Sequence, residues 1–185
     1  MDRKRILWIT QTAIFIALLV SSQAVTRPLG QFVTGSLVNF MLVSACILVG
    51  LSSAAFVSTV SPIFAFLIIG MPVFPVLIPF LMAGNLVLVT AIHFIARKSF
   101  SDLTLGSYIK MGVGAVIGAV LKFLVLWVGI VQIAIQFIPD IRPPQVEALS
   151  TTFSWPQLVT ALIGSTLAIV IMPRLKKALK QSDQS

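Results

Sequence analysis

Acidic side chains are few in this sequence of 185 residues, and none of them interrupts an apolar run. The five acids are found at the chain ends or in polar links: Asp2, Asp102, Asp140, Glu147 and Asp183. The chain therefore offers no carboxylate at membrane depth, where a proton-driven exporter or an intramembrane aspartyl protease needs one. This scarcity argues against both classes of protein.

Histidine and cysteine are also scarce, with one of each, His93 and Cys46. His93 has no second His, Cys or acid at metal-ligand spacing, so we expect ordinary packing and no metal site. Cys46 lies inside an apolar run and is expected to be a small buried residue. The glycine-rich stretch from Gly114 to Lys122 has the wrong spacing for a phosphate-binding P-loop. We expect no cofactor, and the energy for any transport has to come from a partner.

Apolar residues dominate what is present, at 58% of the chain against 10% charged residues. The mean hydropathy of +1.06 lies far above that of soluble domains. The 13 Lys and Arg outnumber the acids, but they flank apolar runs and form no solvated basic face for nucleic acid. The sequence therefore predicts one integral-membrane domain over residues 1–185, with the lipid bilayer and no nucleic acid as a partner.

Six apolar runs are long enough to cross a bilayer, and Ile6 to Val25 is the first. Its roughly twenty uncharged residues match a hydrocarbon core of about 30 Å. The other runs cover residues of about 35 to 51, 54 to 69, 76 to 96, 105 to 138 and 157 to 172. The fifth exceeds one crossing and is expected to tilt or to project beyond the outer surface. The predicted fold is an all-α bundle of about six transmembrane helices, with the polar segment Pro139 to Pro156 as its main outer loop.

Basic residues are distributed unevenly between the two ends of these predicted helices. Nine lie on the N-terminal side: Arg3, Lys4, Arg5, Arg97, Lys98, Arg174, Lys176, Lys177 and Lys180. Only Arg27 and Arg142 lie in the loops on the other side. Because cytoplasmic segments carry the excess of Lys and Arg, we predict a multi-pass protein of the cell membrane with both termini in the cytoplasm.

A small polar set within the runs supplies the candidate binding residues. Asn39, Asn85 and Lys122 lie inside apolar runs, and polar groups in lipid usually face the bundle interior, where they bond one another or line a cavity. The ammonium of Lys122 either faces such a cavity or snorkels along its helix. Gln31 and Thr34 lie near the outer edge.

The two outer arginines are further candidates. Arg27 and Arg142 can either meet an anionic group of a ligand at the mouth of a pocket or remain solvated loop charges. The sequence leaves both interpretations open.

Small residues recur at helical spacing in the first and fifth runs. Ala13 and Ala17 share one helix face, which serves either packing within the chain or docking of a separate protein. Gly114 and Gly118 show the same spacing, and we favour tight helix packing over a hinge there.

Together these features resemble the substrate-binding S-components of energy-coupling factor (ECF) vitamin transporters. The resemblance rests on Ala13-xxx-Ala17, on Leu29 to Asn39 (LGQFVTGSLVN), on Ser61 to Ala65 (SPIFA), and on Pro79 with Gly84-Asn85. It implies that Ala13 and Ala17 contact the transmembrane coupling subunit, and that two ATPase subunits power transport. It also implies an outward-opening vitamin pocket, which here points to the segments 27–34, 71–75 and 140–152.

Alternatives remain for the identity of the ligand and for the class of transporter. A large ligand such as cobalamin or another corrinoid fits wide apolar outer loops and is our first expectation, while pantothenate or another small carboxylate would use Lys122 as a cationic clamp. A secondary transporter or small channel is the alternative class, although polar residues become fewer toward the cytoplasmic helix ends. An enzyme is not expected, because no Ser or Thr has a His or acid partner at one depth.

Overall fold

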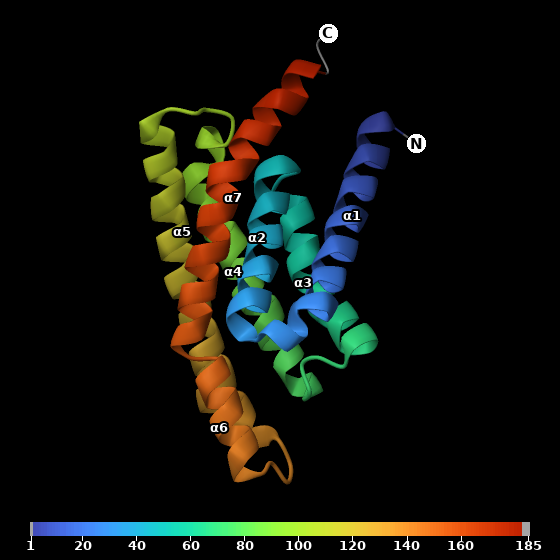
Figure 1. Ribbon diagram of the computed structural model, residues 1–185, viewed down its shortest axis with the longest axis vertical. Coiled ribbons are helices and arrows are strands. Elements are labelled where there is room, and N and C mark those ends of the chain that lie inside the picture. Colours follow the sequence, from blue (N-terminus) through green and yellow to red (C-terminus); the bar gives the residue numbers. More distant parts are fainter. Residues whose placement is uncertain (1, 183–185) are drawn as a thin grey trace.

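Residues 2–182 are described by the computed structural model, and in this range the chain forms seven α-helices and no strand (Figure 1). The helices are α1 (Arg3–Thr26), α2 (Gln31–Leu48), α3 (Leu51–Ile69), α4 (Ile78–Ala96), α5 (Leu105–Leu126), α6 (Pro143–Thr152) and α7 (Trp155–Ser182). Six of the helical segments are long and apolar enough to cross a membrane. The prediction of an all-α membrane bundle with about six crossings is confirmed. Asp183 and the side chain of Lys180 lie outside the described residues.

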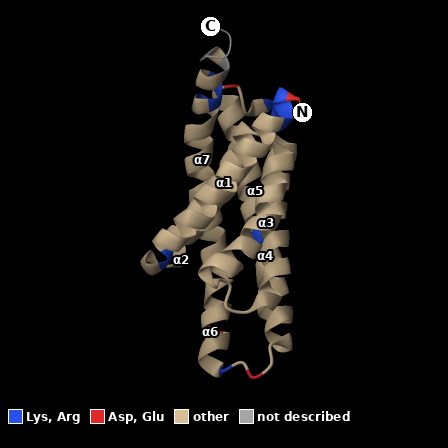
Figure 2. Ribbon diagram, turned by 90° about the vertical axis from the view of Figure 1, so that its right-hand side faces the viewer, with Lys and Arg blue, Asp and Glu red and all other residues tan. Residues whose placement is uncertain are grey.

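Successive long helices run in opposite directions, so the start of α1 and the end of α7 lie at the same end of the bundle (Figure 1). We call this the terminal end. The basic clusters at the start of α1 and near the end of α7 gather there (Figure 2). The bundle places the start of α1 and the end of α7 on one side, and the cytoplasmic location of the termini stays a prediction.

Two pairs of helices make the most extensive contacts in the bundle. α2 packs along α7 and α4 packs along α5, while α1 lies outside, against α2 and α3. A Cβ built on Gly118 would lie 3.0 Å from the carbonyl oxygen of Leu88, and one on Gly114 would lie 3.3 Å from Cα of Ile92. These glycines therefore allow α5 to approach the backbone of α4, which confirms the prediction of tight packing.

The chain reverses direction between α1 and α2 sooner than the sequence predicts. A single 3-10 turn, η1 (Arg27–Leu29), follows α1, and α2 begins at Gln31, about four residues earlier than expected. Gly30 precedes it with a φ of 87°, a conformation that glycine adopts without steric cost. The expected outer loop is therefore mostly helical, which fixes Gln31 and Thr34 on the first turn of a helix.

The predicted loop Pro139 to Pro156 contains the helix α6, which the sequence analysis missed. Pro143 and Pro144 open this helix, where proline's fixed φ is favourable and its missing N–H costs nothing. The Gln145 side chain accepts a 3.0 Å hydrogen bond from the Arg142 backbone N–H and caps the same end. The polar composition of the segment therefore reflects an exposed helix as well as turns.

The fifth run projects at the end opposite the termini, as its length predicts. α5 continues through the π-helix η4 (Trp127–Ile133) and the 3-10 turn η5 (Ala134–Phe137), and this extension pairs with α6 beyond the other helices (Figures 1 and 2). A small apolar cluster holds the hairpin together: Leu77, Leu126, Ile130, Ala134, Ile138 and Phe153. The larger core of the bundle lies nearer the terminal end.

Candidate functional site

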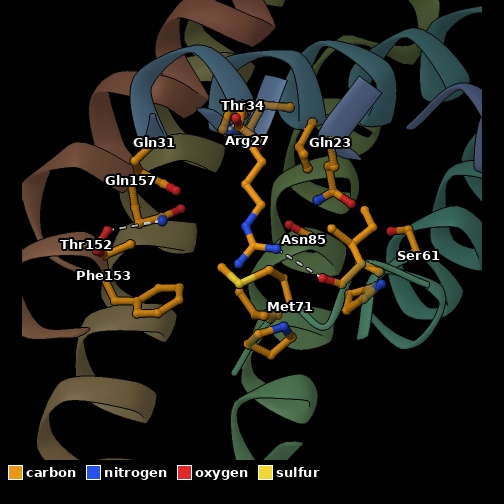
Figure 3. A pocket seen from close by; sticks show the side chains of 18 of the residues that line it. Gln23, Arg27, Gln31, Thr34, Ser61, Met71, Asn85, Thr152, Phe153 and Gln157 are labelled. Atoms are coloured by element: carbon orange, nitrogen blue, oxygen red, sulfur yellow. Dashed lines mark hydrogen bonds between the residues drawn. The ribbon is translucent and has the colours of Figure 1, made fainter. Parts of the chain in front are cut away.

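A cavity of about 290 Å³ lies at the end of the bundle opposite the termini (Figure 3). Its walls come from the end of α1, η1, the first turns of α2, the end of α3 and the loop after it, α4, α5 and the α6–α7 junction. Six of the predicted binding residues line it: Arg27, Gln31, Thr34, Asn39, Asn85 and Lys122. Residues separated by up to 95 positions in the sequence are thus brought to one place.

The floor of the cavity is a polar cluster of Lys122, Asn39 and Asn85. Nζ of Lys122 donates a 2.6 Å hydrogen bond to Oδ1 of Asn39 and a 2.7 Å hydrogen bond to Oδ1 of Asn85. All three side chains are buried, with Lys122 only 3% exposed. Because an ammonium group can only donate, both amides must turn their oxygens toward it. Lys122 therefore faces the cavity and does not snorkel.

A backbone carbonyl group holds the side-chain amide of Asn39, and the side-chain amide of Asn85 is not held in this way. Nδ2 of Asn39 donates a 2.8 Å hydrogen bond to the carbonyl oxygen of Gly35, one turn earlier in α2. Nδ2 of Asn85 and the third N–H of Lys122 have no protein acceptor within residues 2–182. The floor thus presents two unused donors to whatever occupies the cavity.

The Arg27 side chain reaches into the cavity. Figure 3 shows its side chain extending between Gln157 and Gln23, toward Met71. Its Nη1 donates a 3.2 Å hydrogen bond to the carbonyl oxygen of Ile69 at the end of α3. This contact leaves the other N–H groups of the guanidinium available.

Thr34 and Gln31 have different roles at the mouth. The Thr34 hydroxyl donates a 2.9 Å hydrogen bond to the carbonyl oxygen of Thr26, which ties the start of α2 to the end of α1. Gln31 lines the cavity without a side-chain hydrogen bond to the described residues. Thr34 therefore supports the wall, while the Gln31 amide is free to bind a solute.

Sequence reasoning missed several lining residues, among them Gln23, Ser61, Phe153 and Gln157. Oε1 of Gln23 is buried without a hydrogen-bond partner among the described residues. The sequence does contain a signal for Gln23 as a lining residue, since it is a polar residue near the end of an apolar helix. Phe153 offered no such signal, because it reaches the cavity through the turn that joins α6 to α7.

Arg142 does not line the cavity. It is the N-cap residue of α6, near the tip of the projecting hairpin, and its side chain is exposed. The two outer arginines are thus in separate places, with Arg27 alone at the cavity.

The cavity ends at its polar floor. Toward the terminal end, the next turns of α2, α4 and α5 carry fully buried apolar side chains, including Leu42, Leu88 and Ala119. These side chains close the bundle between the cavity and the terminal end. The described residues therefore form a site that is open at one end only.

A second concave surface lies on the outside of the bundle between α1 and α3. The residues that line it are Ala13, Ile16, Ala17, Val20, Ser21, Ala24, Phe64 and Ile68. Both alanines are exposed, so within the described chain they do not serve close helix packing. We call this surface the α1 groove.

Comparisons with protein-family models, with curated proteins and with solved structures each found no match. The structure itself defines a class: a multi-pass helical membrane protein with a cavity at one end of its bundle.

Proposed function

We propose that this chain is the substrate-binding S-component of an ECF-type ABC importer. In this proposal the cavity takes up a vitamin at the outer face of the cell membrane. A transmembrane coupling subunit and two ATPase subunits then drive its delivery inward. The cytoplasmic termini predicted from the basic residues put the cavity outside, where an importer needs it.

One observation carries the proposal: three of the stretches that resemble ECF S-components contribute residues to the cavity. Leu29 to Asn39 supplies Gly30, Gln31, Thr34, Gly35, Val38 and Asn39 to its lining. Ser61 to Ala65 and Gly84-Asn85 supply further lining residues from α3 and α4. A resemblance in three separate stretches thus corresponds to one concave site, as expected if the stretches share a binding function.

The cavity volume bears on the choice of ligand. About 290 Å³ is near the lower end of the range for small-molecule sites, about 300–1,000 Å³. Cobalamin, with its macrocycle and nucleotide loop, would have to remain largely outside or to displace the surrounding loops. The volume supports pantothenate or another small vitamin over the corrinoid that the apolar loops suggest.

The closed floor favours an S-component over a channel. A channel needs a continuous polar path toward the terminal end, and buried apolar residues occupy that region. A secondary transporter is also closed on one side in each state, so the ATP dependence of uptake decides between it and an S-component. The floor is compatible with a subunit that reorients as a whole to release its ligand.

The exposed α1 groove supports the proposed partner. Small residues allow a helix of another membrane protein to approach closely, and Ala13 and Ala17 keep the groove open. A bulky side chain at both positions would fill the groove without touching the cavity.

The proposal is tested by purifying the chain with the ECF coupling subunit and two ATPases encoded in the same genome. The wild-type chain should co-purify with them and support ATP-dependent uptake in proteoliposomes. The double variant Ala13→Trp with Ala17→Trp should fold, keep its ligand and lose the complex. Val116→Trp with Val120→Trp is the matched control, because these residues are also four positions apart and exposed, but on α5.

Uptake that continues without ATP would favour the secondary-transporter alternative. Complex formation by the Ala13 and Ala17 variant at the level of the control would remove the proposed docking role.

A further inference from the structure

We propose that the ligand is a small carboxylic acid whose anionic group binds at the floor of the cavity, on Lys122. This inference rests on the proposed solute-binding function and specifies its substrate class. Three features carry it: the charge of the lining, the open donors at the floor and one unpaired acceptor on the wall.

The lining has cations and no counter-ion. Arg27 and Lys122 both face the cavity, and no Asp or Glu is among the lining residues. Within residues 2–182, no ion pair links Lys122 to an acid; its partners are two neutral amides. A buried ammonium without an opposite charge is costly in a membrane protein, and an anionic ligand would relieve that cost.

The open donors at the floor match a carboxylate. One N–H of Lys122 and the Nδ2 group of Asn85 lack acceptors among residues 2–182. An ionised carboxylate accepts hydrogen bonds through two oxygens and donates none, so it suits a floor that offers donors without acceptors. A phosphate group could accept hydrogen bonds from the same N–H groups, so phosphatase treatment is included in the test to separate the two anions.

The wall of the cavity adds a requirement on the rest of the ligand. Oε1 of Gln23 is buried and has no hydrogen-bond partner in the described part of the chain, and the Gln23 side chain points into the cavity (Figure 3). A buried acceptor without a donor costs free energy, so the ligand is expected to carry a hydroxyl or an amide N–H that faces Gln23. The structure thus assigns a small acid with at least one further polar group, held between the floor and Gln23.

The test uses rich growth medium, filtered to remove macromolecules and divided by anion exchange at pH 8. The retained fraction contains the acids, and the unretained fraction contains neutral and cationic compounds. The full-length protein, purified in detergent from cells grown in minimal medium, is heated with each fraction. The retained fraction should raise Tm by several degrees, before and after phosphatase treatment, and the unretained fraction should not.

Two variants test whether the Tm shift depends on the polar cluster at the floor of the cavity. Lys122→Met should lose the Tm shift, while the control Lys110→Met, an exposed lysine of the same helix, should keep it. Asn85→Asp provides a second test, since it places a carboxylate beside the ammonium while keeping the side-chain shape. This variant should fold and should also lose the shift, because the internal acid replaces the ligand's anionic group.

A shift with the unretained fraction alone, a shift with neither fraction, or a shift that Lys122→Met and Asn85→Asp both keep would overturn the inference. A shift abolished by phosphatase would overturn the assignment of a carboxylate. These results are distinct from failure of the proposed function, because complex formation through the α1 groove is measured without any ligand.

Discussion

Lys122 on α5 and Asn39 on α2 are 83 positions apart in the chain, yet Nζ of the lysine lies 2.6 Å from Oδ1 of the asparagine. The same Nζ lies 2.7 Å from Oδ1 of Asn85 on α4. One ammonium therefore links three helices at the depth where the cavity ends. Hydrogen bonds to charged groups are stronger than those between neutral groups, so this cluster both shapes the floor and holds the helices in register.

The first prediction concerns the energy of this cluster. Asn85→Leu removes one acceptor from the buried ammonium and should lower the free energy of unfolding by about 1–3 kcal/mol. In a Lys122→Met background the same change should cost less, with a coupling energy of about 1–2 kcal/mol. The measurement is a double-mutant cycle by unfolding in mixed detergent micelles.

Gln132→Leu serves as the control for this cycle. Gln132 lies ten positions beyond Lys122, about 15 Å along a helix, so its effect should add to that of Lys122→Met. Equal effects of Asn85→Leu in both backgrounds would show that the hydrogen bond does not stabilise the fold.

The second prediction concerns Gly164, which sets the spacing between α7 and α2. A Cβ at this position would lie 2.7 Å from Cβ of Asn39 and 2.7 Å from the backbone nitrogen of Phe40. Gly164→Ala should therefore destabilise the protein by about 1–3 kcal/mol through overpacking. It should also weaken ligand binding, because Asn39 must shift from Lys122.

Gly112→Ala is the matched comparison, since a Cβ at Gly112 meets nothing within 4 Å. Alanine is favoured over glycine in a helix, so this variant should be as stable as the wild type or more stable by up to about 1 kcal/mol. Equal stability of the two variants would contradict the close contact between α2 and α7.

The third prediction concerns the orientation of the bundle in the membrane. Cys46 is 0% exposed and is expected to be unreactive, and the Cys46→Ala variant removes the native thiol before new cysteines are introduced. A membrane-impermeant maleimide should label Glu147→Cys in intact cells and Ser101→Cys only after permeabilisation. The opposite pattern would invert the topology, and labelling of both in intact cells would contradict the antiparallel arrangement.

The helices could be predicted from the sequence because their cause is local. A run of about twenty apolar residues has few alternatives to a membrane-spanning helix, and the two ends of α4 differ from the predicted ends by two residues at most. The start of α2 was predicted less well, since a single positive-φ glycine, Gly30, allows an immediate reversal. α6 was missed because an exposed, polar helix has no apolar pattern to reveal it.

The candidate site was predictable in part for a related reason. Asn39, Asn85 and Lys122 stand out because polar groups inside apolar runs need partners, and this need identifies the residues without identifying the pairs. Their mutual contacts depend on how α2, α4 and α5 pack, which spacing along the sequence does not determine. Arg142 illustrates the same limit, since its loop position resembled that of Arg27 and the fold placed it away from the cavity.

Native mass spectrometry of the protein purified from cells grown in rich medium tests the central claim most directly. The claim is that the end cavity holds one small solute through the floor cluster. The wild-type chain should carry a single adduct small enough for a cavity of about 290 Å³, and Lys122→Met should lack it while Lys110→Met retains it. A wild-type chain without any adduct, or an adduct that Lys122→Met retains, would contradict the claim.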